Sequence, residues 1–243
     1  MPERFYLPAD LNCSELQLDG SEAHHLIHVL RARTGQEIIV FNGTGQVADA
    51  TVVEVSRRSA RLRISKSRTE SDATGIRVTL ATAVPKGERF RWLIEKATEM
   101  GVERVIPLMT ERSVVDPRQS KLEKLKQTVI AACKQCGRNR LMLIEDVASW
   151  NSFINNTTPA HKLLVAHPGE NQSITQMRSQ FALPNQETVV VVGPEGGFTE
   201  DEIRMLEERD AQLVDLGSRI LRIETAAISL IAWLNFCVDR AEC

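Results

Sequence analysis

The sequence predicts a two-domain α/β protein, in which a small β-barrel precedes a mostly parallel sheet with helices on both faces. The first observation is a change of pattern: short strands fill residues 1–70, and from residue 76 strands alternate with amphipathic helices. The second is the valine run 189–192, which lacks polar alternation and indicates a strand buried on both faces. The polar stretch 66–75 contains no large apolar residue and predicts a linker between the two regions.

The first region is expected to hold five short strands and one helix. The strands are expected at residues 5–7, 15–18, 37–41, 47–55 and 60–65. Ser21 is the expected N-cap of a helix that places Leu26, Ile27 and Leu30 on one side. Residues 43–48 match the dinucleotide fingerprint G-x-G-x-x-[G/A], but a strand follows where that site needs a helix. The dipeptide at 42–43, Asn-Gly, favours a hairpin turn instead.

The second region shows the alternation that is typical of a parallel sheet. Strands are expected at 77–83, 102–108, 141–145, 162–166 and 189–192, and helices at 88–100, 121–136, 147–154, 173–180 and 226–238. Gly101 and Gly137 follow the first two helices and act as stop signals. Thr199 and Glu202 form a capping box that begins one further helix.

Composition is that of an ordinary soluble globular protein. The chain has 243 residues, of which 42% are hydrophobic and 26% charged. Its N-terminus lacks the pattern of a signal peptide, and the most apolar run, 226–238, is shorter than the ~20 residues that span a bilayer. Five cysteines without regular spacing fit reduced thiols better than a disulfide framework. These features predict a cytoplasmic enzyme without a membrane segment.

The net charge of −2 conceals an uneven distribution. Residues 84–140 carry thirteen basic and seven acidic side chains, whereas residues 141–243 carry seven basic and fifteen acidic ones. A basic middle third is consistent with a phosphate-binding face and equally with solvated helix surfaces.

Several motifs carry little chemical signal. Cys133 and Cys136 form a C-x-x-C at the C-terminal end of a helix, where the dipole disfavours thiolates, so a packing role is favoured. The histidines at 24, 25 and 28 lack the glutamate and further ligands of a zinc site, and no metal is predicted. No P-loop lysine follows a glycine loop, which gives nucleotide hydrolysis no support.

Two glycine loops after neighbouring strands predict a ligand pocket. Gly193–Gly197 follows the valine run, and residues 216–226 combine a glycine turn with the start of the last helix. Leu216, Ile220 and Leu221 offer an apolar wall for a flat ring. Glycines that only turn the chain are the simpler alternative. A third segment, 136–140, presents arginines suited to phosphate, or equally a capped helix end.

The motifs VVVVGPEGGFTEDE, LGSRILRIETAA and AACKQCGRNR together resemble the RsmE family of ribosomal RNA methyltransferases in the SPOUT superfamily. The segments RFYLP and HVLRAR extend the resemblance over nearly the whole chain. It implies a PUA-like β-barrel RNA-binding domain at 1–71 and a SPOUT α/β domain with a C-terminal trefoil knot at 72–243. It also implies a homodimer that uses S-adenosylmethionine to methylate N3 of a uridine in 16S ribosomal RNA, within the small ribosomal subunit.

The resemblance also implies the residues of the site. The cofactor-binding residues would be Leu164, Val165, Ala166, His167, Val192, Gly193, Pro194, Glu195, Gly196, Gly197, Leu216, Gly217, Ile220, Leu221, Arg222, Thr225 and Ala226. For catalysis, Arg222 is the candidate cation and Glu224 the candidate base or orienting group, unless the two only form an ion pair that fixes the helix start. The candidate RNA-binding residues are Arg4, Arg31, Arg33, Lys86, Arg89, Lys134, Arg138, Asn139 and Arg140.

Two other functions stay open from the sequence. Another SPOUT methyltransferase would act on a ribose 2′-hydroxyl or on a different base. A non-catalytic RNA-binding module would use the barrel to bind RNA and the α/β domain only to dimerise.

Overall fold

The chain divides into two compact units, which are described separately. The computed structural model describes residues 2–70, 76–115, 119–169, 172–181 and 186–237. The first unit comprises Met1–Asp72 and Ile130–Leu141, and the second comprises Ala73–Val129 and Met142–Cys243. The first unit therefore includes the segment 130–141, which is far from the barrel in sequence and falls within the second domain expected at 72–243. The expected boundary after residue 71 lies outside the described residues.

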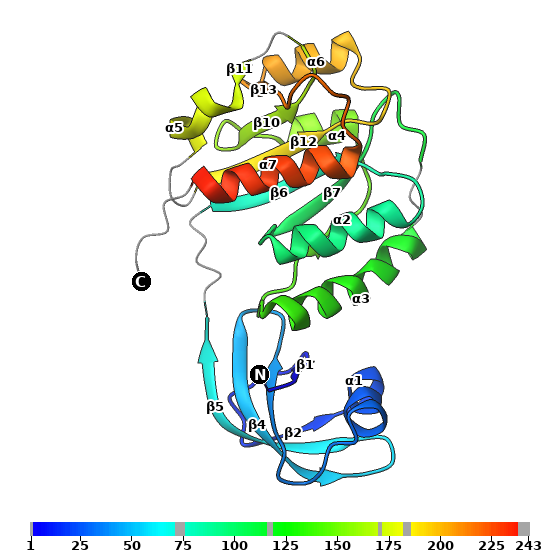
Figure 1. Ribbon diagram of the computed structural model, residues 1–243, viewed down its shortest axis with the longest axis vertical. Coiled ribbons are helices and arrows are strands. Elements are labelled where there is room, and N and C mark those ends of the chain that lie inside the picture. Colours follow the sequence, from blue (N-terminus) through cyan, green and yellow to red (C-terminus); the bar gives the residue numbers. More distant parts are fainter. Residues whose placement is uncertain (1, 71–75, 116–118, 170–171, 182–185, 238–243) are drawn as a thin grey trace. The chain divides into compact units, whose positions relative to one another are not determined.

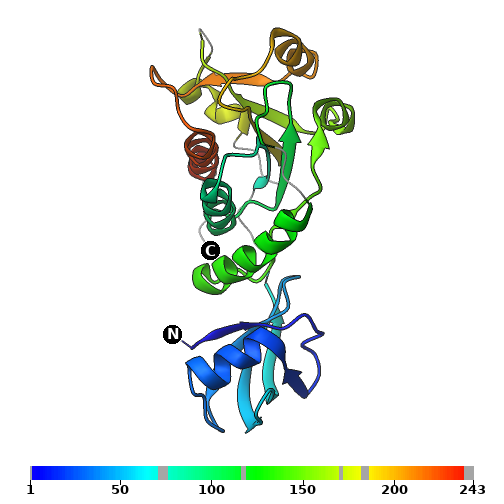
Figure 2. The same cartoon turned by 90° about the vertical axis from the view of Figure 1, so that its right-hand side faces the viewer.

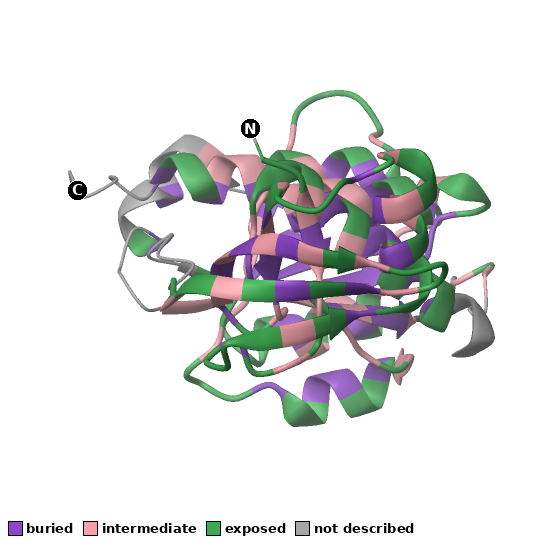
Figure 3. Ribbon diagram, turned by 90° about the horizontal axis from the view of Figure 1, so that it is seen from below, coloured by how far each residue is buried: buried purple, intermediate pink, exposed green. Residues whose placement is uncertain are grey.

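The first unit contains a five-stranded sheet in the order β1-β3-β4-β5-β2. Its strands are β1 (Arg4–Tyr6), β2 (Glu15–Leu18), β3 (Glu37–Phe41), β4 (Gln46–Val55) and β5 (Ala60–Thr69). The β1–β3 pair is parallel and the other pairs are antiparallel. Buried and exposed residues alternate along these strands (Figure 3), and the buried face packs around Phe5, Leu26 and Val52. The β3–β4 hairpin at Asn42-Gly43 is confirmed.

Two local expectations in this unit were wrong. β5 continues to Thr69, so residues 66–69 are strand rather than linker. This end of β5 pairs with the start of β4 through polar side chains, such as Arg68 and Asp49 at 3.5 Å, and therefore lacks apolar alternation. Ser21 is not an N-cap: α1 (Gly20–His24) begins after Asp19 and passes into a π-helical turn, η1 (His25–Val29).

Asn139 connects the segment 130–141 to the barrel. It is 3% exposed, its amide nitrogen donates to Glu70 Oε2 at 2.6 Å, and its amide oxygen accepts from Arg4. Its backbone oxygen accepts from the Gly45 nitrogen at 3.1 Å. Burial lowers the pKa of the Arg4 guanidinium below its ordinary value, because the charged form loses contact with water.

We expect Asn139→Ala to lower the free energy of unfolding by about 1–3 kcal/mol, because it removes the hydrogen bonds of a buried amide to Glu70 and to the half-buried Arg4 guanidinium. Urea denaturation of the full chain measures the change. Asn155→Ala, at an exposed position of the helix Trp150–Asn156, is the matched control and should shift stability by less than about 0.5 kcal/mol. Equal effects of the two substitutions would contradict the role of Asn139.

The second unit is built on a parallel sheet in the order β11-β13-β10-β12-β6-β7-β8, with β9 pairing β7. The strands are β6 (Ile76–Ala83), β7 (Arg104–Met109), β8 (Leu143–Ile144), β9 (Ala148–Ser149), β10 (Lys162–Ala166), β11 (Gln172–Ser173), β12 (Gln186–Val192) and β13 (Gln212–Asp215). The expected parallel sheet is confirmed, and its strand order is compatible with the knotted chain path that the resemblance implies.

Helices cover both faces of this sheet, as expected. They are α2 (Glu88–Glu99), α3 (Gln119–Cys136), α4 (Trp150–Asn156), the 3-10 turn η2 (Ile174–Met177), α5 (Arg178–Phe181), α6 (Glu200–Glu207) and α7 (Ile223–Cys237). In Figures 1 and 2, α2 and α7 lie on one side of the sheet, and α4 and α6 lie on the other. No helix within the described residues is long and apolar enough to cross a membrane.

The central strands end together at one edge of the sheet. Val192 at the end of β12 is in register with Thr82 of β6 and with Ala166 of β10, and Ala83 is in register with Leu108 of β7. Loops that follow these strands therefore lie side by side, at the edge where open α/β sheets bind ligands.

Candidate functional site

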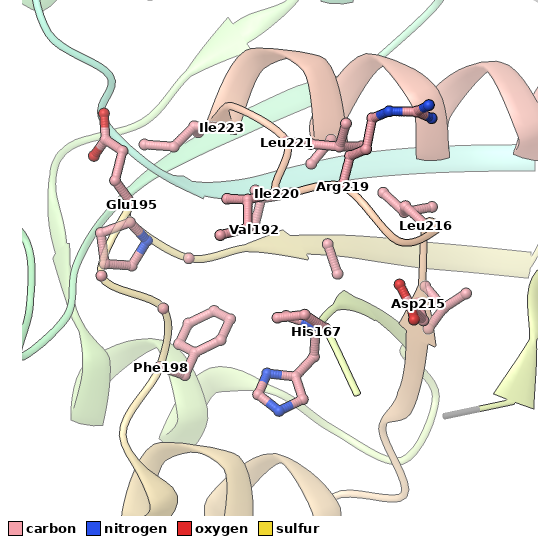
Figure 4. A pocket seen from close by; sticks show the side chains of 18 of the residues that line it. His167, Val192, Glu195, Phe198, Asp215, Leu216, Arg219, Ile220, Leu221 and Ile223 are labelled. Atoms are coloured by element: carbon pink, nitrogen blue, oxygen red, sulfur yellow. The ribbon is translucent and has the colours of Figure 1, made fainter. Parts of the chain in front are cut away.

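A cavity of about 250 Å³ lies at the carboxyl edge of β10, β12 and β13. Three chain segments line it: the end of β10 with the following loop, the glycine loop after β12, and the segment between β13 and α7 (Figure 4). Thirteen of the expected cofactor-binding residues line this cavity, namely Ala166, His167, Val192, Gly193, Pro194, Glu195, Gly196, Gly197, Leu216, Gly217, Ile220, Leu221 and Ala226. The two glycine loops therefore form one site.

Four expected residues do not line the cavity. Leu164 and Val165 are fully buried in β10, where they belong to the core of the sheet. Arg222 and Thr225 are exposed and lie beside lining residues at the start of α7.

Six lining residues were missed: Pro168, Phe198, Val214, Asp215, Arg219 and Ile223. Val214 and Asp215 lie at the end of β13, and ligands of open α/β sheets bind at strand ends. The position of this strand end could therefore have predicted both residues. Phe198 directly follows the glycine loop, but only packing shows that its ring faces the cavity.

The cavity combines an apolar wall with a backbone-rich loop. Ile220 is 95% exposed, and Figure 4 shows it near Val192 and Leu221, with Phe198 and His167 across the space from them. An apolar side chain so exposed at a cavity is suited to cover the face of a flat ring. The Asp215 carboxylate accepts from the Gly217 nitrogen at 2.9 Å and fixes the turn after β13.

The glycine loop is held in shape from both ends. A Cβ on Gly193 would lie 3.0 Å from the Phe198 ring, which would have to shift, and Gly197 has a φ of 70°, at which other residues are strained. The expected capping box is present: Glu202 accepts from the Thr199 nitrogen at 2.9 Å, and Thr199 accepts from the Glu202 nitrogen at 3.2 Å. Glu202 also accepts from the Glu111 nitrogen, at 2.9 Å, which ties the loop after β7 to this helix start.

Glu224 pairs with Arg89 and not with Arg222. The Glu224 side chain is 9% exposed, and its Oε1 lies 3.7 Å from Arg89 Nη1. The Arg89 guanidinium also contacts Glu195 of the glycine loop, with Nη2 3.4 Å from Oε1. Glu224 Oε2 is buried and has no hydrogen-bond partner among the described residues. The guanidinium of Arg222 makes no hydrogen bond or ion pair with any residue that the structure describes.

The candidate RNA-binding residues fall into different environments. Arg31, Arg33, Arg140 and Lys86 are exposed. Lys134 pairs with Glu22 at 2.9 Å, and Arg89 pairs with the two carboxylates described above. Asn139 is buried against Arg4, and Arg138 is half-buried, with its backbone oxygen 3.5 Å from Arg4 Nη2. Exposure therefore favours the first four for contact with a ligand.

The cysteine and histidine motifs lie partly buried and partly at the surface. Cys133 is buried and Cys136 exposed at the end of α3. The rings of His24 and His28 lie 4.8 Å apart on one face. No group of three or more potential metal ligands occurs within the described residues.

Comparison with known proteins agrees with this geometry. The RNA methyltransferase domain family matches residues 72–235, and the RNA methyltransferase PUA domain family matches residues 18–65. The ribosomal RNA small subunit methyltransferase E of Bacillus subtilis is 32% identical over 229 residues, covering 90% of this chain and 89% of the relative.

Two solved structures are also similar over 98% of each chain. One is a ribosomal RNA small subunit methyltransferase E from Neisseria gonorrhoeae bound to S-adenosyl methionine, with 29% identity and a TM-score of 0.89. The other is a methyltransferase from Legionella pneumophila in complex with the same cofactor, with 28% identity and a TM-score of 0.88. With the family match, these similarities bear out the resemblance seen in the sequence: the chain belongs to the small-subunit ribosomal RNA methyltransferase E family.

Proposed function

We propose that the protein uses S-adenosylmethionine to methylate N3 of a specific uridine in 16S ribosomal RNA, in the assembled small ribosomal subunit. The observation that carries this proposal is that both glycine loops line one cavity, beside which the Arg222 guanidinium has no hydrogen-bond or ion-pair partner among the described residues. Relatives named ribosomal RNA small subunit methyltransferase E, one of them solved with S-adenosyl methionine bound, support the choice of substrate and cofactor.

The residues of the cavity fit this cofactor. Leu216, Ile220 and Leu221 offer an apolar wall for the adenine ring, and the two glycine loops bring backbone donors and acceptors close to its polar groups. The bound cofactor would supply an electrophilic methyl group for in-line displacement, so catalysis by the protein consists largely of positioning and electrostatics.

Arg222 is the proposed cation of the reaction. The uridine N3 carries a proton, and its lone pair becomes a good nucleophile only as that proton leaves, so a cation beside the uracil oxygens favours the reactive anion. Arg222 immediately precedes α7, where its backbone oxygen accepts from Ala226 at 2.9 Å. A cation at a helix N-terminus is unfavourable by about 0.3–1 kcal/mol, and no carboxylate of a described residue pairs with this one. Helix stability therefore gives no reason for an arginine here.

Glu224 is proposed to orient rather than to accept the proton directly. Its carboxylate is buried against Arg89 and is not part of the cavity lining. Through Arg89 it connects the start of α7 to Glu195 in the glycine loop, so the two walls of the cavity share one ion-pair network.

The remaining parts of the proposal concern RNA and assembly. The PUA-like unit with its exposed arginines would hold ribosomal RNA, and the protein would act in the cytoplasm. α7 leaves Phe236 80% exposed, which suits burial against a second copy in a homodimer.

Methyl incorporation tests this function. We expect transfer from labelled S-adenosylmethionine into small subunits isolated from a strain without this enzyme, with much less transfer into protein-free ribosomal RNA. Mass mapping of nucleosides should identify N3-methyluridine. A 2′-O-methyl nucleoside would establish the rival methyltransferase activity, and a failure to bind the cofactor in titration calorimetry would leave only the RNA-binding module.

A further inference from the structure

Arg112 contacts the glycine loop from outside the segments that line the cavity. It follows β7, and its Nη1 donates to the Gly196 oxygen at 2.9 Å and to the Phe198 oxygen at 3.3 Å. A Cβ on Gly196 would lie 3.3 Å from the Arg112 Cβ, so the aliphatic stem also packs closely on this glycine. Nη1 of the guanidinium therefore holds the glycine loop by hydrogen bonds.

The remaining donors of the Arg112 guanidinium are those of Nε and Nη2. Arginine has five N–H donors, of which Nη1 supplies two and Nε and Nη2 supply three. Arg112 is exposed, and its Nε and Nη2 have no hydrogen-bond or ion-pair partner within the ranges that the structure describes. The N–H groups of Nε and Nη2 that point the same way form a planar fork, which matches two oxygens of a phosphate.

The surroundings of Arg112 favour an anion from nucleic acid. The loops after β6 and β7 adjoin the glycine loop, because these strands end in register with β12. Lys86 in the loop after β6 is exposed, and like Arg112 it has no ion pair with a described residue. Unpaired cations beside a cofactor cavity are suited to hold the phosphodiester backbone of an incoming strand.

We propose that Arg112 has two roles: its Nη1 holds the glycine loop, and its Nε–Nη2 edge binds a phosphodiester of the RNA strand that carries the target base. This inference rests on the proposed function for the identity of the strand. It makes Arg112 an RNA-binding residue that also fixes the cofactor loop, which the sequence motifs did not include.

Arg112→Ala and Arg112→Lys separate the two roles. S-adenosylmethionine affinity is measured by titration calorimetry, and affinity for isolated small subunits by filter binding over a series of KCl concentrations. We expect Arg112→Ala to weaken cofactor binding about five- to tenfold, through the lost hydrogen bonds to two carbonyls. It should also reduce the slope of log affinity against log salt by about one. Arg112→Lys keeps the charge and should therefore retain the wild-type salt slope. It should bind the cofactor less tightly than wild type, because one ammonium group cannot contact the glycine loop and a phosphate at the same time as a guanidinium does.

Arg204→Ala is the matched control, since Arg204 is an exposed arginine of α6 that pairs with Asp201 at 2.7 Å. It should leave both measurements unchanged. A wild-type salt slope in Arg112→Ala would overturn the phosphate contact, and wild-type cofactor affinity in that variant would overturn the loop-holding role. Both variants are checked for folding by thermal melting. If wild-type protein binds cofactor and subunits but transfers no methyl group, the proposed function fails, while both binding measurements still decide the role of Arg112.

Discussion

Arg222→Ala is expected to slow methyl transfer by about a hundredfold or more, while S-adenosylmethionine affinity changes by less than about threefold. The loss corresponds to removing one charge-stabilising group from a transition state. The small effect on affinity follows because Arg222 is exposed beside the cavity and does not line it. Single-turnover transfer into small subunits and titration calorimetry measure the two quantities.

Two further measurements separate this role from a structural one. Because a cation at the start of α7 opposes the helix dipole, Arg222→Ala should leave thermal stability unchanged or slightly raised. The rate of methyl transfer by Arg222→Ala should increase with pH. At higher pH hydroxide removes the N3 proton, which the cation no longer assists. Arg219→Ala is the matched control: Arg219 lines the cavity, so its removal should weaken cofactor binding more than transfer from the bound cofactor. Equal losses of affinity and rate in Arg222→Ala would show a structural or cofactor-binding role instead.

The parallel sheet and the position of the cavity were predictable because their causes are local. Val189–Val192 is apolar on both faces, and the next residues are a glycine-rich turn and a capping box, each of which is determined by nearby sequence. The two strands that precede the loops are not neighbours, because β10 lies between β12 and β13, but both loops lie at the same edge of the sheet. They form one pocket, which thirteen of the seventeen expected cofactor-binding residues line.

The parts that escaped prediction depend on contacts between distant segments. Asn139 looked like a surface amide suited to RNA, but it is buried between Arg4 and Glu70, which lie far away in sequence. Arg112 belongs to none of the sequence motifs. It reaches the glycine loop because β7 pairs in register with β6, so that the loop after β7 lies at the same edge of the sheet. Local patterns predict elements and their ends, whereas the partners of polar side chains follow from topology.

The charged pair at the last helix shows the same limit. The sequence placed Arg222 and Glu224 two residues apart and offered an ion pair between them as the simple explanation. Side chains two positions apart do not face each other on a helix. Glu224 instead forms an ion pair with Arg89 of α2, and Arg222 is exposed.

Arg89→Ala should therefore destabilise the protein and should not act primarily on RNA binding. It removes the partner of a carboxylate that is only 9% exposed. Breaking a fully buried pair costs about 3–5 kcal/mol, and we expect about 2–3 kcal/mol here because the Arg89 side chain retains 31% exposure to screening water. Urea denaturation measures the loss, and the salt dependence of subunit binding should stay close to that of wild type.

The double variant Arg89→Ala with Glu224→Gln tests the cause. A neutral amide needs no cation, so the double variant should recover part of the stability lost in Arg89→Ala, with a coupling energy of at least about 0.5–1 kcal/mol between the two positions. Arg91→Ala on the same helix is the matched control, because Arg91 and its partner Glu88 are 63% and 90% exposed. Such a surface pair contributes at most about 1 kcal/mol. Two results would contradict this role: Arg89→Ala lowering the free energy of unfolding no more than Arg91→Ala, or Glu224→Gln restoring none of the lost stability. Either would show that the buried pair does not join the start of α7 to the glycine loop. Arg89 would then again be a candidate RNA contact.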